Sequence, residues 1–390
     1  MAHDISKAET TKTARRIPPY EALAESLRLK LAKRPADAGG LVGNEVGIAR
    51  ESGLSRMTVR RAVQMLVDEG LLERRAGRGI FVSEARTSAM RSIRVLVGNL
   101  LWAPAVRVAQ AVQEEAQKAG REASVFDARG NLAAFLDELK ALPDSGFAGA
   151  VIMSQHDAAF NRALVGLVAV EFPFVVVDQT LSDLPADSVS SDNQAGGRLA
   201  AEALLAAGHV RLAFLGDMAA DTTAARAQGV ADACAEALVP PPLRLAIPGQ
   251  RFGDWEPAIR RSVNKLLNEK NRPTALACSC DAVARIAMRA LASHDIAVPD
   301  EISVTGFDDD PIAEWTSPAL TTVRQDFSEM GRRAYALLTA RLADPAAAPR
   351  HEDVAVTLIE RQSIAPKSPT LHPASHSLHG ADHSPREATA

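Results

Sequence analysis

Cysteine is scarce in this chain of 390 residues, which contains only Cys234, Cys278 and Cys280. Three cysteines cannot form a disulfide framework, and their spacing matches no zinc site. We therefore expect reduced core residues and no bound metal. The sequence also lacks any run of about 18 apolar residues, so we expect no membrane-spanning helix.

Other absences narrow the class of protein further. The N-terminal sequence has no apolar stretch of the kind found in secretory signals, so we expect a cytoplasmic location. There is no phosphate-binding loop and no dinucleotide-binding glycine motif, and we expect no cofactor. Aromatic residues make up only 4% of the chain, but 47% is hydrophobic, which excludes a wholly disordered protein. The length predicts two or three domains.

Positive charge is concentrated at the N-terminal end. Residues 1–86 carry 16 lysines and arginines against 11 acidic residues, whereas the remainder carries 28 against 37. This distribution is typical of a nucleic-acid-binding module joined to a part that phosphates repel, although an excess of this size also arises by chance.

Three helices and a hairpin are expected within about 70 residues, after a disordered tail at 1–16. Pro18 and Pro19 open the first helix, Asn44 can cap the second, and Ser55 can cap the third. The apolar stripe of the third helix consists of Val59, Ala62, Val63, Leu66 and Val67. A glycine-rich turn at 77–79 then joins two short strands. This order predicts a winged helix-turn-helix over 17–84.

The third helix and the turn carry the groups expected to contact double-stranded DNA. Arginine can pair with guanine in the major groove, and threonine can meet a phosphate or a thymine methyl group. The glycines let the backbone approach the duplex. The predicted contacts of this kind are Arg56, Thr58, Arg60, Arg61, Gly77, Arg78 and Gly79. The alternatives are a merely solvated basic face or a winged helix used for protein contacts.

After a linker at 85–92, apolar strands alternate with helical stretches. The expected strands are 93–97, 123–126, 149–153, 174–177, 210–215, 244–247, 275–279 and 302–307. The expected helices include 104–119, 194–207, 226–237, 256–270 and 281–293. The pattern predicts an α/β fold with parallel sheets covered by helices on both faces, as one large sheet or as two lobes. The tail at 366–390 is expected to be disordered.

Polar side chains follow several of these strands. Asp178, Asp281 and Asp308 come directly after apolar segments, where an open α/β sheet borders its ligand crevice. Further candidates for such a pocket are Arg226, Trp255 and Phe327. Carboxylates, a guanidinium and aromatic faces suit a small polyhydroxylated ligand or a ring. Taken singly, each aspartate could instead cap a helix, and Trp255 could be a core residue.

Residues 17–83 resemble the GntR family of bacterial regulators. The similar segments read YEALAESLR and IARESGLSRMTVRRAVQMLVDEGLLERRAGRGIFV. The resemblance implies that Arg56, Thr58, Arg60 and Gly79 occupy DNA-contact positions. It adds Asn44 and Glu45 to the predicted interface, and it places Val46 where the family usually has a DNA-contacting arginine.

Residues 93–365 resemble the effector domain of the LacI family, most specifically in GFDDDPIAEWTSPALTTVRQDFSEMGRRA. The resemblance implies two lobes, about 93–190 with 324–351 and about 191–323 with 352–365, and a ligand bound between them. By this resemblance the effector contacts include Arg226, Trp255, Asp308 and Phe327. Cys280 replaces a polar residue that usually precedes Asp281, and Trp102 is expected on the opposite wall.

A GntR-type head on a LacI-type body is the arrangement of arabinose-repressor-like regulators. We therefore predict a homodimeric transcription repressor, not an enzyme, that reads a pseudo-palindromic operator and is released by a small carbohydrate-like effector. A corepressor would use the same machinery in reverse. The alternative is a protein that binds or processes small molecules and whose winged helix serves protein contacts.

Overall fold

The computed structural model describes residues 18–32, 40–83, 92–155, 157–181, 184–247 and 255–367. The expected tails and linker lie outside these ranges, apart from Ser92, Pro366 and Lys367. The chain forms two compact units, the first comprising Met1–Asp192, Ala220–Thr222 and Gln325–Val356, and the second Asn193–Ala219, Thr223–Arg324 and Thr357–Ala390. We call residues 18–83 the head, the rest of the first unit lobe 1, and the second unit lobe 2.

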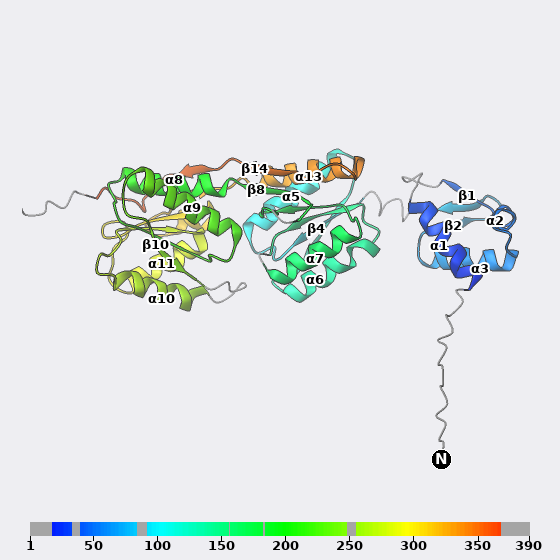
Figure 1. The fold of residues 1–390 in the computed structure, drawn as a ribbon, viewed down its shortest axis with the longest axis horizontal. Coiled ribbons are helices and arrows are strands. Elements are labelled where there is room, and N and C mark those ends of the chain that lie inside the picture. Colours follow the sequence, from blue (N-terminus) through cyan, green and yellow to red (C-terminus); the bar gives the residue numbers. More distant parts are fainter. Residues whose placement is uncertain are drawn as a thin grey trace, which may run out of the picture. The chain divides into compact units, whose positions relative to one another are not determined.

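The head has the expected three helices and hairpin (Figure 1). Its elements are α1 (Pro19–Ala32), β1 (Leu41–Gly43), α2 (Glu45–Ser52), α3 (Arg56–Asp68), β2 (Leu72–Arg75) and β3 (Gly79–Val82). Both predicted caps are confirmed: Asn44 Oδ1 accepts from the Gly47 amide at 2.7 Å, and Ser55 Oγ accepts from the Thr58 amide at 3.2 Å. The strand order is β1-β3-β2, so β1 adds to the hairpin a third strand that the sequence did not predict.

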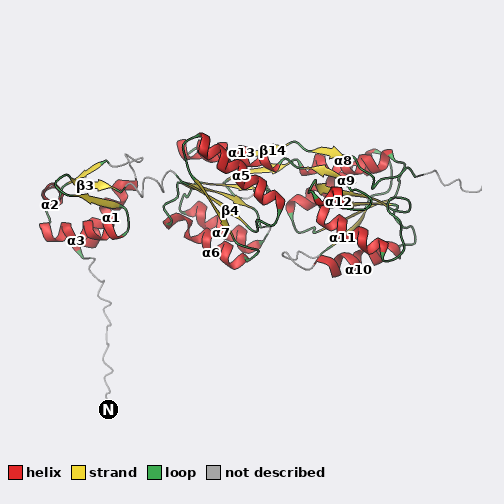
Figure 2. Cartoon of the chain, turned by 180° about the vertical axis from the view of Figure 1, so that it is seen from behind, coloured by secondary structure: helices red, strands yellow, loops and turns green. Residues whose placement is uncertain are grey.

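Lobe 1 contains a six-stranded sheet of order β14-β8-β7-β6-β4-β5, in which every neighbouring pair is parallel. Its strands are β4 (Ile93–Val97), β5 (Ala123–Asp127), β6 (Gly149–Met153), β7 (Phe174–Val177), β8 (Asp187–Ser191) and β14 (His351–Val354). Its helices are α5 (Ala103–Lys118), α6 (Leu132–Ala141), α7 (Ala158–Ala169) and α13 (Phe327–Ala343), with a short 3₁₀ turn at Leu142–Asp144. Helices cover both faces, as predicted (Figures 1 and 2).

Side chains that alternate between the two faces of the lobe 1 sheet contribute to two separate hydrophobic cores. On β4, Val95 and Val97 face α5 and α13 and pack with Val108 and Met330. Leu96 points to the opposite face, where the second core contains α6 and α7. Because both faces are covered, the central strands β4, β6 and β7 are largely apolar and their bounds are readable from the sequence.

Lobe 2 contains a second six-stranded sheet, of order β10-β9-β11-β12-β13-β15, so the expected strands divide between two sheets. Only the β13–β15 pair is antiparallel. Its strands are β9 (Leu212–Gly216), β10 (Leu243–Ala246), β11 (Ala275–Cys278), β12 (Ser303–Asp308), β13 (Thr321–Arg324) and β15 (Thr357–Ile359). Its helices are α8 (Asn193–Ala206), α9 (Asp221–Glu236), α10 (Trp255–Leu267), α11 (Asp281–Ala292) and α12 (Ile312–Trp315).

Helices α8 and α9 cover one face of this second sheet and α10 and α11 cover the other (Figure 1). The backbones of α8 and α9 cross closely: a Cβ atom at Gly197 would lie 2.0 Å from the carbonyl oxygen of Arg226. Only glycine permits this approach, which sets the position of α9 and of the Arg226 side chain.

Candidate nucleic-acid interface and ligand-binding residues

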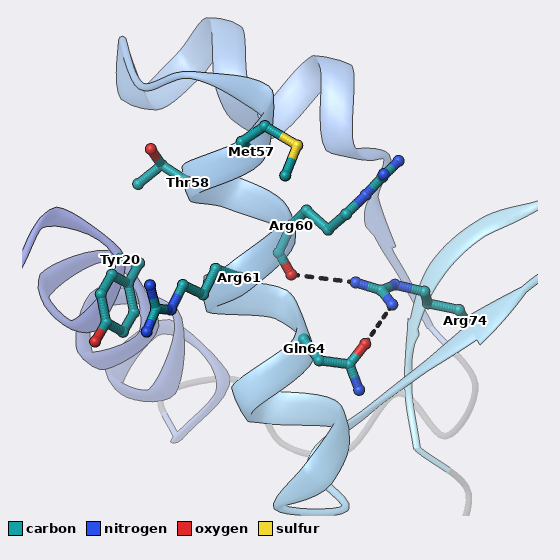
Figure 3. A pocket seen from close by; sticks show the side chains of 7 residues that line it. All are labelled: Tyr20, Met57, Thr58, Arg60, Arg61, Gln64 and Arg74. Carbon is teal, nitrogen blue, oxygen red and sulfur yellow. Dashed lines mark hydrogen bonds between the residues drawn. The ribbon is translucent and has the colours of Figure 1, made fainter.

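The first candidate site is a groove on the outer face of α3 (Figure 3). The residues that line it are Tyr20, Met57, Thr58, Arg60, Arg61, Gln64 and Arg74. The apolar residues Val59, Val63 and Leu66 of the same helix face the core of the head. The amphipathic pattern therefore turns the basic residues outward, as the sequence predicts.

Glu45 organises the basic side chains in this groove. Its carboxylate accepts from Arg60 Nε at 3.2 Å, and it lies 3.5 Å from Arg74 Nη2. Arg74 also donates to Gln64 Oε1 at 2.5 Å and to the Arg60 carbonyl oxygen at 3.2 Å. The hydrogen bond with Glu45 raises the pKa of Arg60. The network therefore orients Arg60 and Gln64 beside each other on the outer face of α3.

Arg74 is a candidate that the sequence analysis missed. The alternation of side chains along a strand could have indicated it. Leu72 is buried in the core of the head, and Arg74, two residues later, lies on the same face of β2. That face is directed toward α3, so the alternation alone predicts that Arg74 approaches the helix.

The other predicted DNA contacts fall in several places. Arg56 opens α3 and is exposed, whereas the Arg61 guanidinium lies over the Tyr20 ring, 4.1 Å from its centroid. Thr58 Oγ1 lies 2.8 Å from Ser55 Oγ, so this hydroxyl is engaged at the start of the helix. The Asn44 side chain likewise serves as the cap of α2.

The hairpin turn carries the remaining predicted contacts of the head. Gly77 and Arg78 are exposed in the turn between β2 and β3. Gly79 has a φ of +117°, and a Cβ atom there would lie 2.7 Å from the Gly43 carbonyl oxygen, so this position requires glycine to bring β1 and β3 together. Val46, at the position of the missing arginine, is 55% exposed.

The second candidate site centres on Arg226 in lobe 2. Its Nε donates to Asn193 Oδ1 at 2.7 Å, and its Nη1 donates to the Ser279 carbonyl oxygen at 2.6 Å. Asp308 Oδ1 lies 3.9 Å from Nη1, and the guanidinium stacks 3.8 Å from the centroid of the Phe307 ring. The structure thus brings Arg226 and Asp308 together at the carboxyl ends of the strands, where a ligand is expected.

Asn193 and Phe307 belong to this cluster and were not predicted. Asn193 begins α8, two residues after the end of β8, a strand whose polar sequence did not reveal it. Its contact with Arg226, 33 residues later in the chain, joins α8 to α9. A local sequence pattern does not reveal such a contact.

The backbone that carries Asp308 is strained. Asp308 has a φ of +110° and Asp309 a φ of +52°. Residues other than glycine rarely adopt positive φ angles. Asp281 fixes this turn, since its Oδ2 accepts from the Asp310 amide at 2.8 Å and its Oδ1 accepts from Thr322 Oγ1 at 2.5 Å. Burial raises the pKa of Asp281 to about 7. Both oxygens are engaged within lobe 2, so Asp281 is placed to hold the Asp308 turn.

Two further predicted residues of lobe 2 lie at helix starts. Cys280 is the N-cap of α11, and burial, with the nearby Asp308 carboxylate, raises the pKa of its thiol to about 12. The thiol is therefore protonated at neutral pH and is no nucleophile. Trp255 begins α10, where it is half-buried against the core shared with α11.

The remaining predicted ligand contacts belong to lobe 1. Trp102 precedes α5 and Phe327 begins α13, and their rings meet edge to face with centroids 6.3 Å apart. Asp178 follows β7, is buried and has a φ of +65°. Phe327 is only 1% exposed within the core of lobe 1, whereas Trp102 is half-buried.

The described residues contain no group of three or more histidines, cysteines, aspartates or glutamates arranged to hold a metal ion. None of the helices in the described part of the chain is long and apolar enough to cross a membrane.

Fold and sites together define a winged-helix head joined to a two-lobed α/β body. Residues 19–82 match the family model of the bacterial regulatory proteins of the gntR family. Residues 201–364 match that of the periplasmic binding protein-like domain. The predicted combination of a GntR-type head with a periplasmic-binding-protein-like body is therefore confirmed.

Curated relatives match about half of the chain. The chain is 30% identical over 198 residues to the ribose operon repressor of Haemophilus influenzae, covering 50% of this chain and 59% of that protein. It is 34% identical over 196 residues to the HTH-type transcriptional repressor PurR of Yersinia pestis, covering 50% and 56%. The chain thus spans little more than half the length of these relatives.

Solved structures share the fold of the body. A LacI family transcriptional regulator from Enterococcus faecium with bound ribose has a TM-score of 0.59 at 24% identity, over 71% of this chain and all of that one. The lac repressor dimer bound to operator and an anti-inducer has a TM-score of 0.59 at 24% identity, over 70% and 94%. These likenesses confirm the predicted α/β fold.

Proposed function

We propose that this chain is a bacterial transcription repressor that binds an operator through its head and a small-molecule effector through its body. The observation that carries this proposal is the exposed arginine face of α3 in a GntR-type domain on the same chain as a periplasmic-binding-protein-like domain. The matched relatives bear the names of repressors, which supports the same function. The protein acts in the cytoplasm, where its DNA is, and not as an enzyme.

In this proposal α3 lies in the major groove, with Arg56 and Arg60 reading base edges. Thr58, Arg61 and the wing residues 77–79 contact mainly the phosphate backbone. The two heads of a homodimer read the two halves of a pseudo-palindromic operator, because a protein with two-fold symmetry binds a DNA sequence with matching two-fold symmetry.

The effector is a carbohydrate-like molecule, and each lobe carries candidate contacts for it. In lobe 2 the contacts are Arg226, Asp308, Cys280 and Trp255, and in lobe 1 they are Trp102, Asp178 and Phe327. Paired donors and acceptors beside aromatic faces suit hydroxyl-rich ligands. Two similar solved structures are described with bound ribose and one relative is named a ribose operon repressor, which supports a sugar as the class to test first.

A selection experiment tests the DNA-binding half. The full chain is used to select fragments from a random DNA library, and binding is then titrated on the selected site and on random DNA. Arg60→Ala should weaken binding to the selected site by about fivefold to more than a hundredfold, because a guanine contact is lost. Its effect on random DNA should be smaller.

Arg162→Ala is the matched control, since Arg162 is an exposed arginine of α7 in lobe 1. It should leave both affinities unchanged. Equal losses of Arg60→Ala on both DNAs would mean that Arg60 contacts only phosphate. Failure to select any fragment would contradict the proposed function.

A further inference from the structure

Met57 is an apolar side chain exposed on the basic face of α3. Its exposed fraction is 70%, above that of Leu41 and Val46, the other exposed large hydrophobic residues of the described part of the head. Met57 precedes Arg60 by three positions, so the two share one face of the helix. Figure 3 shows both side chains on the same side of α3.

A lone exposed apolar residue is ordinary, but the surroundings of Met57 are not. It lines the groove together with Arg60, Arg61, Gln64 and Arg74, all of which carry hydrogen-bond donors. The core of the head is built by the opposite face of α3, so folding gives no reason for a thioether here.

The base edges exposed in the major groove offer one group that an apolar side chain matches, the 5-methyl group of thymine. The neighbouring guanidinium of Arg60 matches acceptors such as guanine O6 and N7, whereas the Gln64 amide nitrogen donates to Asp68 Oδ1 at 2.7 Å. Glu45 accepts from Arg60 Nε at 3.2 Å and so orients the Arg60 side chain on the face that carries Met57. Methionine is unbranched and adapts its shape to the surface it meets.

We propose that Met57 is a specificity-determining residue that contacts the 5-methyl group of a thymine next to the base read by Arg60. This inference rests on the proposed DNA-binding function. It adds a preference for thymine that no charged residue of the head supplies.

Uracil substitution tests the contact one methyl group at a time. In the selected operator each thymine is replaced singly by deoxyuridine, which keeps every hydrogen-bonding group and lacks only the methyl. The full chain should lose about fourfold in affinity at one thymine of each half-site, the value expected for one buried methyl group. Met57→Ala should bind the thymine and uracil forms equally at that position.

Two variants serve as controls. Leu41→Ala removes an apolar side chain that is 60% exposed on β1 and does not line the groove. This variant should therefore lose as much affinity as the wild type when the thymine is replaced by deoxyuridine. Thr58→Ser removes the only other methyl group of the groove that a thymine could meet while keeping the hydroxyl. If Thr58→Ser, and not Met57→Ala, abolishes the uracil effect, Thr58 is the reader and the proposal is wrong.

Salt dependence separates a methyl contact from a charge contact. Met57→Ala should keep the wild-type slope of affinity against salt concentration, because it loses no phosphate contact. Its melting temperature should also be unchanged, since the side chain is exposed. A wild type that binds its operator but is insensitive to uracil everywhere overturns the role of Met57 and leaves the proposed function intact. A chain that selects no DNA overturns both.

Discussion

Asp281 shows how much one buried carboxylate can fix in lobe 2. Its two oxygens join the start of α11 to Thr322 on β13 and to the turn that carries Asp308. Burial disfavours its charged form and raises its pKa to about 7 from an ordinary value of 3.8. The residue therefore changes its protonation state near neutral pH within the candidate ligand site.

The sign of the resulting pH dependence follows from linkage. Between about pH 4 and pH 7 the folded protein keeps a proton on Asp281 that the unfolded chain has released. The contribution of this carboxyl to the unfolding free energy therefore falls as pH rises through that window and is constant above it. Asp281→Asn should remove this component, because its amide can donate to Thr322 Oγ1 while its oxygen accepts from the Asp310 amide.

Melting temperatures measured between pH 5 and pH 8 check this prediction. The difference between Asp281→Asn and the wild type should grow in favour of the variant as pH rises toward 7. Parallel profiles would mean that Asp281 has the same protonation state across the range, which would contradict the raised pKa.

At the scale of elements, the sequence predicts strands that are apolar and misses those that are not. The predicted bounds of β4, β6 and β7 agree with the structure, because both faces of these strands are buried. β8 was not predicted: in DSVSS only the valine is apolar, yet all five residues are buried. Asp187 is paired with Arg341 at 2.9 Å, and Ser188 Oγ lies 2.9 Å from His351 Nδ1. Partners more than 150 residues away leave no local pattern.

The candidate sites divide in the same way. The exposed face of α3 follows from helical periodicity within one segment, and so the sequence locates it. The contacts of Arg226 with Asn193 and Ser279 join three separate elements, so the sequence offered Arg226 as a pocket candidate but did not indicate these partners. β13 and the helices α6, α7 and α13 were likewise not among the predicted elements.

The close crossing of α8 and α9 gives a prediction at this scale. Gly197→Ala should push the helices apart and destabilise lobe 2 by about 1–3 kcal/mol, with a fall of several degrees in melting temperature. The response to ligand should weaken with it, because the backbone of Arg226 is displaced. Calorimetry and ligand-induced thermal shift measure the two effects.

Gly166→Ala is the matched control for that substitution. Gly166 lies in α7, and nothing is within 4 Å of the Cβ atom that alanine would add. This variant should be as stable as the wild type or more stable by up to about 1 kcal/mol, since alanine favours the helix. If both variants behave alike, the α8–α9 crossing is looser than described.

At the scale of the whole molecule, the proposed function requires the head and the body to be coupled. A screen of the full chain by thermal shift against monosaccharides, sugar phosphates, uronates and purines should identify the effector class. A ligand at 100 times its Kd adds about 2.7 kcal/mol of stability. If that ligand changes operator affinity by some factor, saturating operator must change ligand affinity by the same factor.

Asp308→Ala separates the two activities. It should abolish the ligand-induced shift and the ligand effect on operator affinity, while operator binding without ligand stays as in the wild type. Thermal shift and DNA titration on the same preparation measure both. Loss of operator binding as well would show that Asp308 is needed for the structure and is not a ligand contact.

Lobe 1 is built from segments that are far apart in the sequence, which affects when it can fold during synthesis on the ribosome. Its core needs Phe327, Met330, Ala334 and Leu338 of α13, which are synthesised more than 200 residues after β4. The core of the head is complete by Val82. At about 5–20 residues per second, the head emerges on the order of 10–50 s before lobe 1 can close. A nascent or prematurely ended chain thus carries a finished head without a finished lobe 1, and under the proposed function such a head would meet DNA without any control by an effector.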